Sequence, residues 1–292
     1  MTSVTATATV TPARRGGRLR RRFARRPVAV VGLLGVCIVV LVALFAPLVA
    51  PYSPTASDYN AILQPPGTPG HLLGTDDVGR DLLSRLVFGA RASLTAGVLA
   101  TMLAVVVGVP LGMIAGFYRG WVDPILSRIT DVVLSFPFLI LAVGLAAILG
   151  PSLINASIAL AVAQVPIFVR IARGEVLALR EQEYVQAAVV NGAPTRVILF
   201  RHMLPNILSP LVVQATVAIP AAIIGAAVLS FLGLGVQPPT PAWGTMLSEA
   251  QQYVSQAPWF ATFPGLAIAL TTLSFNLFGD GLRDVLDVRM RS

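Results

Sequence analysis

The stretch EYVQAAVVNGAPTRVILFRHMLPN, residues 183–206, is a polar, arginine-containing island in a chain that is otherwise dominated by long apolar runs. Tyr184, Ala187 and Ala188 share one helical face at i, i+3 and i+4 spacing. Gly192 follows and is the residue type that most readily adopts the left-handed conformation with which many helices end. A first short helix is therefore expected to end at this glycine.

A second helix is expected directly after the glycine. Pro194 has the fixed φ that suits a first helical turn. Val197, Phe200 and Leu204 then continue at helical spacing as far as Pro205. The island is predicted to form two short helices hinged at the glycine, a shape suited to docking on a soluble partner.

The composition indicates a membrane protein. Apolar residues make up 55% of the chain, the mean hydropathy is +0.79 and 12% of residues are charged, whereas soluble domains average about a quarter charged. Gly150-Pro151 separates two of the uncharged runs, and Pro166 and Arg170 bound the shorter one. We predict an all-α fold with six transmembrane helices, in the runs 28–50, 92–118, 132–156, 157–169, 207–236 and 257–279.

The arginines predict the orientation. Eight of them precede the first run, which by the positive-inside rule places the N-terminus in the cytoplasm. Six spans then place both termini and the island on that side of the cytoplasmic membrane. The expected parts are a cytoplasmic Arg-rich arm (1–27), a first span with an extracytoplasmic loop (28–91), a core (92–279) with a cytoplasmic loop (173–206), and a cytoplasmic tail (280–292).

The end of the extracytoplasmic loop has the pattern of an amphipathic helix. Its apolar and polar residues fall on opposite sides at helical spacing, so we expect an interfacial helix that leads into the second span. The apolar side carries Leu82, Leu83, Leu86 and Val87, and the polar side carries Arg80, Ser84 and Arg85.

Several chemistries are excluded. All 21 basic residues are arginine, so the chain has no phosphate-binding G-x-x-x-x-G-K-[ST] loop and is not its own ATPase. The arginines of the arm have no interleaved aromatic residues, which argues against nucleic-acid binding. Cys37 is predicted to be a small buried apolar residue. His71 and His202 fall on opposite sides of the membrane, so we expect no metal site, no catalytic triad and no cofactor on this chain.

Ionisable residues are nearly absent at mid-membrane depth, which argues against an ion-coupled secondary carrier or a channel. Five polar residues lie at depth: Gln164, Gln214, Thr216, Ser274 and Asn276. Each could line a translocation path, and for each a hydrogen bond between helices is at least equally expected. The residues selected as path candidates are Gln214, Thr216, Ser274 and Asn276.

The spacing within the island resembles the cytoplasmic loop of membrane subunits in bacterial ATP-binding-cassette importers. That loop has the pattern E-A-A, a Gly four residues later, and I-x-L-P ten residues beyond the Gly. Gln186 and His202 depart from the pattern, standing in place of Glu and Ile, and the matching residues are Ala187, Ala188, Gly192, Leu204 and Pro205.

Three further segments indicate which subfamily of these importers the chain resembles. L-G-T-D-x-x-G-R-D (73–81), FLGLGVQPPTPAWGTML (231–247) and NLFGDGLRDVLDVR (276–289) are similar to the C-type membrane subunit of peptide importers, closest to dipeptide permeases. Only Val288, where the family usually has Pro, departs at the tail. The resemblance runs from about residue 20 to the end and leaves the cargo open among dipeptides, oligopeptides, nickel, glutathione and haem.

The resemblance implies the MetI-like permease fold of type I importers and a non-catalytic role. It implies as partners a homologous B-type permease subunit, one or two cytoplasmic ATPase subunits that bind ATP and Mg, an extracytoplasmic substrate-binding protein and the lipid bilayer. The resemblance places the island against the ATPase. Our candidate residues for this contact are Glu183, Gln186, Ala187, Ala188, Gly192, Arg196, Arg201, Leu204 and Pro205, with Arg180 as a further candidate.

Two features near the ends of the last spans have alternative interpretations. Trp243, beside a cluster of prolines, either touches the substrate-binding protein or is an interfacial tryptophan on a rigid loop. Gly279-Asp280-Gly281 is expected to be a helix-ending turn rather than an ion site.

Overall fold

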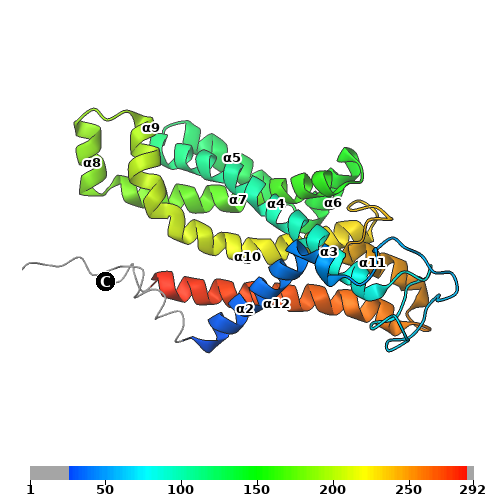
Figure 1. Cartoon of the computed structure of the whole chain (residues 1–292). Helices are drawn as coiled ribbons and strands as arrows, with labels where there is room; N and C mark the ends of the chain where they lie inside the picture. The colour runs from blue at the N-terminus through cyan, green and yellow to red at the C-terminus, as the bar shows by residue number, and fades with distance from the viewer. Residues whose placement is uncertain (1–25, 288–292) are drawn as a thin grey trace, which may run out of the picture.

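The computed structural model describes residues 26–287, and this part of the chain is helical with no β-strand (Figure 1). Nearly all of the Arg-rich arm and the last five residues, including Val288, lie outside the described residues. The elements are α2 (Pro27–Leu44), α3 (Ala46–Val49), α4 (Leu82–Tyr118), α5 (Val122–Leu134), α6 (Phe138–Leu149), α7 (Leu153–Arg180), α8 (Glu183–Val190), α9 (Thr195–Val197), the π-helical turn η1 (Ile198–Met203), α10 (Leu204–Phe231), α11 (Trp243–Ala250), the 3₁₀ turn η2 (Gln251–Tyr253) and α12 (Pro258–Asp287).

Five helical segments are long and apolar enough to cross a membrane, and a sixth span results if the bent pair α5–α6 counts as one. The predicted bounds of the third and fourth runs were wrong. The third is broken by a 90° bend, because Pro137 has no N–H to donate and restricts the residue before it. The fourth is the middle of the 28-residue α7, which continues through Pro166. Arg170 lies within this helix, where it bonds Asp131 of α5 at 2.6 Å.

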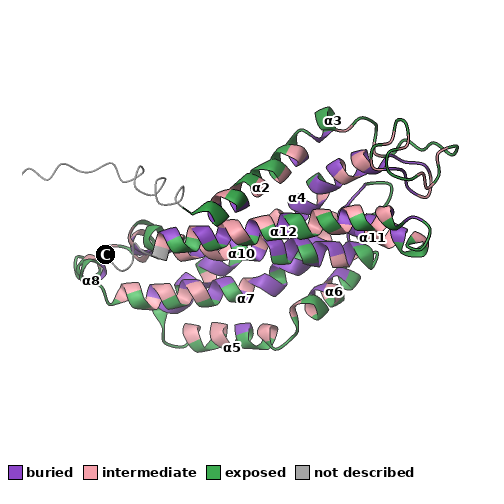
Figure 2. Ribbon diagram, turned by 90° about the horizontal axis from the view of Figure 1, so that it is seen from below, coloured by how far each residue is buried: buried purple, intermediate pink, exposed green. Residues whose placement is uncertain are grey.

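Helices α4 and α7 form the most extensive helix pair of the bundle. At Gly112 of α4 the backbone lies directly against Val169 and Ala172 of α7, where a side chain would clash. Small residues at such crossings let membrane helices approach closely. Figure 2 shows buried residues along the facing sides of α7, α10 and α12, whereas few residues of α2 are buried and this helix packs on α12 by one side. Cys37 is exposed on α2, so the expectation that it is buried was wrong.

The second helix of the island is not a separate short helix. After Gly192 the chain enters α9, passes through η1 and continues as α10 without a break, so that residues 195–231 form one rod. Pro205 was expected to end the helix, but it lies inside the rod directly after the π-helical turn η1, and the helix continues through it. The island therefore consists of one short helix, α8, and the beginning of a span.

The final helix α12 also continues further than expected. It runs through Gly279 and Gly281 to Asp287, so the predicted turn at this place was wrong. Gly279 packs against the side chain of Thr216 on α10. At the end of α12, Asp284 forms an ion pair with Arg26, the residue before α2. The start of α2 and the end of α12 thus lie at the same end of the molecule as α8 (Figure 1).

The other end, which we call the α11 end, contains the loop 51–81, α11 and η2 (Figure 1). The predicted interfacial helix was wrong, because α4 starts at Leu82 and proceeds unbroken into its span. Its supposed polar side is not at a surface, since Ser84 and Arg85 are fully buried. Trp243 is also buried, and its indole N–H donates to the carbonyl of Leu86 at 3.0 Å. Neither interpretation of that tryptophan therefore holds.

Candidate functional site

Helix α8 is anchored by one side and exposed on the other. Val185 is fully buried and Ala188 partly so, both packed on the cluster that includes Ile198 and Met203. The opposite side of α8 points away from the bundle. It presents Glu183, Gln186, Ala187, Val189 and Val190.

The turn after α8 has the hydrogen bonds of a Schellman motif. Gly192 donates its N–H to the carbonyl of Val189, and Ala193 donates to Ala188, both at 3.0 Å. Gly192 has φ +72°, which confirms the predicted left-handed conformation. Nothing lies within 4 Å of a Cβ built there, so the backbone conformation alone calls for glycine.

Beyond the turn, the first residues of the long rod complete the exposed surface. Phe200 of η1 is 60% exposed, and Val190, the last residue of α8, is 86% exposed. Arg196 and Arg201 are exposed and have no hydrogen bond or ion pair with any residue in the described range 26–287. We call the exposed part of α8, the turn and α9–η1 the α8 surface.

Of the nine residues that the sequence placed at the ATPase contact, seven lie exposed on or beside the α8 surface. Ala188 and Leu204 are instead partly buried against the hydrophobic cluster beneath it. Arg180, the further candidate, donates to the carbonyl of Phe117 at 2.9 Å and so fixes the end of α4. Arg119 and Glu181 add an ion pair of 2.7 Å beside it.

Two clefts follow the length of the bundle. The larger, of about 640 Å³, lies between α7, α10 and α12 at the α8 end, and its polar lining includes Glu175, Asn206, Asp280 and Arg283. The smaller, of about 450 Å³, lies where α5 breaks from α6 and is lined by both sides of the break, α7 and α10. Gln214 and Val217 of α10 line both, so the two clefts adjoin at these residues.

The other predicted path residues lie elsewhere. Thr216 is buried and its hydroxyl donates to Val213, beside Gly279. Ser274 bonds the carbonyl of Leu270 and packs against α2. Asn276 is exposed on α12 and lines neither cleft.

Gln164 lines the smaller cleft and was not among the predicted path residues. Its Nε2 lies 3.3 Å from the carbonyl of Ala218, and its Oε1 lies 3.4 Å from the hydroxyl of Thr101. It thus has the expected interhelical role together with a place on the cleft wall. The signal for this place was an amide in the middle of an apolar run.

A bundle of membrane-crossing helices with an exposed helix-turn surface at one end and clefts along its axis has the architecture of a transport permease subunit. Residues 108–292 match the family of the inner membrane component of binding-protein-dependent transport systems, and residues 15–66 match the N-terminal transmembrane domain of oligopeptide transport permease C. The chain therefore belongs to the binding-protein-dependent permease family of ATP-binding-cassette importers, as the sequence predicted.

Relatives match along most of the chain. The dipeptide transport system permease protein DppC of Escherichia coli strain K12 is 50% identical, over 92% of this chain and 91% of that protein. DppC of Alkalihalophilus pseudofirmus is 47% identical over 93% and 89%, and the glutathione transport system permease protein GsiD of Pectobacterium atrosepticum is 44% identical over 93% and 90%.

A solved structure supports the fold independently. A chain of the MetNI methionine ABC transporter, in an inward-facing conformation, matches with a TM-score of 0.55 at 24% identity. The match covers 70% of this chain and 96% of that one. The predicted all-α importer permease fold is confirmed.

Proposed function

We propose that this chain is the C-type permease subunit of an importer of dipeptides or oligopeptides. The observation that supports the importer role is the α8 surface. One side of the short helix α8 is buried against the bundle, and its other side is exposed to solvent. The peptide cargo is supported by relatives named dipeptide permeases that are 44–50% identical over nearly the whole chain.

The α8 surface is proposed to seat a cytoplasmic ATPase subunit. Val190 and Phe200 offer apolar area to a groove of the partner, and Arg196 and Arg201 offer charges that are not committed to other described residues. Gly192 holds α8 at a fixed angle to the rod. ATP and Mg belong to the ATPase subunits in this proposal.

Movement of the α8 surface is proposed to reach the clefts through one continuous helical element. The rod 195–231 begins in the α8 surface and carries Gln214 at the junction of the clefts. Pro210 and Pro220 lie inside it and weaken its hydrogen bonding at two places, where a helix can bend. Closure of the ATP-loaded ATPase dimer then shifts the rod and opens the path.

The clefts are proposed to form this chain's half of the path, with a homologous B-type subunit supplying the other half. The amides of Gln164 and Gln214 can donate to and accept from peptide groups, whichever side chains the peptide carries. Of the residues proposed from sequence, Gln214 keeps this role here, whereas Thr216, Ser274 and Asn276 are placed for packing or lie outside the clefts.

The α8 end is proposed to face the cytoplasm and the α11 end the substrate-binding protein outside. The eight N-terminal arginines support this orientation. The ion pair between Arg26 and Asp284 supports a common side for both ends of the described chain.

Glutathione is the second candidate cargo, because it is itself a short peptide and a glutathione permease is 44% identical to this chain. The test is to purify the cognate substrate-binding protein, identify its ligand by mass spectrometry, and then measure uptake of that ligand into proteoliposomes containing the full complex. ATP-dependent uptake of a dipeptide supports the proposal. Uptake by this chain alone without ATP would instead identify a secondary carrier.

A further inference from the structure

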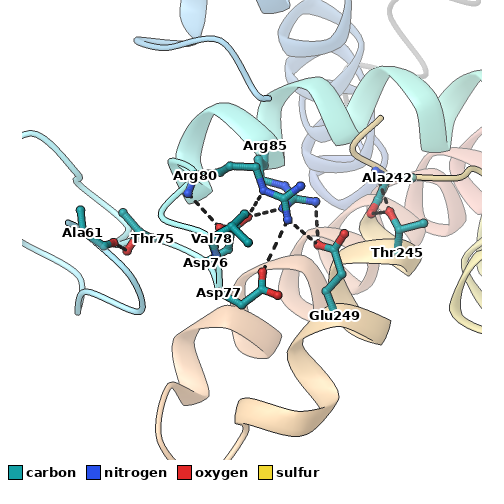
Figure 3. Close-up of polar contacts among 10 residues, drawn as sticks. All are labelled: Ala61, Thr75, Asp76, Asp77, Val78, Arg80, Arg85, Ala242, Thr245 and Glu249. Atoms are coloured by element: carbon teal, nitrogen blue, oxygen red, sulfur yellow. Dashed lines mark hydrogen bonds and ion pairs between the residues drawn. The ribbon is translucent and has the colours of Figure 1, made fainter. Parts of the chain in front are cut away.

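The motif L-G-T-D-x-x-G-R-D folds into a buried ionic network at the α11 end (Figure 3). Arg85, in the first turn of α4, has no solvent-exposed surface. One side of its guanidinium contacts the buried carboxylate of Asp76 in the loop before α4, and Nη2 donates to Oε2 of Glu249 at 2.7 Å. Arg80 bonds the same Asp76 oxygen through Nε at 2.6 Å.

Glu249 is the distant member of this network. It lies on α11, 164 positions along the chain from Arg85. Arg80 lies 3.4 Å from it, and Asp77 lies 3.5 Å from Arg80. The network therefore ties three elements together: the loop, α4 and α11 (Figure 3).

The carboxylates of Asp76, Asp77 and Glu249 lie close enough together to resemble a metal site. The guanidinium groups of Arg80 and Arg85 bond two of these carboxylates directly, so the network already contains its own cations. A buried ion pair of this kind adds little net stability, because burying the charges costs about as much as the pairing returns. Its distinctive contribution is a fixed geometry.

The ionic network fixes the position of α11 relative to α4. Trp243, at the start of α11, bonds Leu86 and lies 3.3 Å from the hydroxyl of Ser93, so α11 rests on α4. Gly244 lies directly against the backbone of Ala227 near the end of α10, where a side chain would clash. Helix α11 thus packs against α4 and the far end of the rod 195–231, and it also packs on α12.

We propose that Arg85 and Glu249 are positioning residues for transport, which hold α11 on α4 and so fix the far end of the rod as a fulcrum. When the ATPase subunit displaces the α8 surface, the rod then bends beside the clefts instead of moving as a whole past α4. The inference rests on the proposed function, in which the ATPase subunit displaces the α8 surface. Pro210 and Pro220 lie between the two ends and provide the places for bending.

The test uses the full complex in proteoliposomes, with peptide uptake and ATP hydrolysis measured on the same preparation. Glu249→Gln keeps the size of the side chain and removes its charge. We expect this variant to assemble and hydrolyse ATP like the wild type, while the peptide transported per ATP falls roughly tenfold, in the range of mutations that alter coupling between sites. Glu249→Asp, which keeps the charge, is expected to restore most of that ratio.

Arg91→Gln is the control. Arg91 is exposed on α4, the helix that carries Arg85, and its side chain forms no ion pair with any residue of the described range. Arg91→Gln should leave the ratio unchanged. An unchanged ratio in Glu249→Gln would overturn the proposal. Loss of assembly in both Glu249 variants would also overturn it, because the residue would then serve folding alone. Failure of the wild-type complex to take up peptide would count against the proposed function instead.

Discussion

Ala193 donates its backbone N–H to the carbonyl of Ala188 at 3.0 Å, across the glycine that ends α8. This bond exists only because Gly192 has φ +72°. The angle between α8 and the long rod is therefore set by one backbone conformation. Around it, the structure leaves empty space rather than packed side chains.

Gly192→Val is predicted to leave the spans inserted and to weaken the docking of the ATPase. The left-handed conformation costs a non-glycine residue roughly 1 kcal/mol or more, and a β-branched one the most. Copurification of the ATPase subunits and peptide uptake should both fall. Gly174→Val is the matched control, because Gly174 also has open space around it but lies inside α7 with a negative φ. Normal uptake by Gly192→Val would show that the segment is an ordinary loop.

Gln214→Leu is predicted to reduce peptide uptake while ATP hydrolysis continues, because it removes the amide at the junction of the two clefts. Leucine is similar in size, so the packing of α10 against its neighbours changes little. Asn276→Leu makes the same kind of change outside both clefts and should have no effect. Equal uptake by the two variants would place the path elsewhere.

The orientation is predicted to be visible by labelling in intact cells. A cysteine at Tyr59, which is 74% exposed in the loop at the α11 end, should react with an impermeant maleimide. A cysteine at Gln182, exposed beside α8, should react only after the membrane is permeabilised. Both cysteine substitutions are made in a Cys37→Ala background, because Cys37 is the one cysteine of the chain. The reverse pattern would invert the proposed topology.

Glu249 is predicted to make stability depend on pH. Burial raises the pKa of its carboxyl above the usual 4.5; Arg85 and Arg80 oppose this shift, and Asp76 and Asp77 add to it. The folded protein therefore takes up this proton at a higher pH than the unfolded chain does. Proton uptake here favours the folded state, and that contribution is lost as the pH rises through the raised pKa.

The corresponding measurement is thermal unfolding of the solubilised complex between neutral and mildly acidic pH. Glu249→Gln cannot ionise, so this variant lacks the pH dependence that comes from the Glu249 carboxyl. The melting temperature of the wild type, relative to that of Glu249→Gln, should rise as the pH falls towards the raised pKa. A difference between the two proteins that stays constant or changes in the opposite direction would contradict the assignment.

Local signals predicted much of the architecture. The length of the uncharged runs alone predicted six spans, and the structure has five helices of membrane-crossing length and one bent pair. The conformation of Gly192 followed from its place between a helical pattern and a proline, since such preferences belong to the residue and its neighbours. The spacing of the island also pointed to the family that the comparisons show.

The positions at which the longer helices end could not be predicted from the sequence. Pro205 and Pro166 lie inside helices that continue through them, whereas Pro137 lies at a 90° break. All three prolines lack the N–H that a helical hydrogen bond needs. The residue type alone therefore could not predict which helix ends at its proline.

The polar residues at the α11 end show most clearly what sequence alone could not give. Ser84 and Arg85 occupy the side of a helical pattern that normally faces water, and their types gave no reason to bury them. A buried arginine is tolerated only where carboxylates meet it, and one of those carboxylates, Glu249, lies 164 positions away. Sequence determined which segments are helical and which end carries the α8 surface, because those depend on neighbouring residues. Only the fold brought Arg85 to Glu249 and placed Gln164 and Gln214 on the wall of one cleft, because both arrangements depend on how separate helices pack.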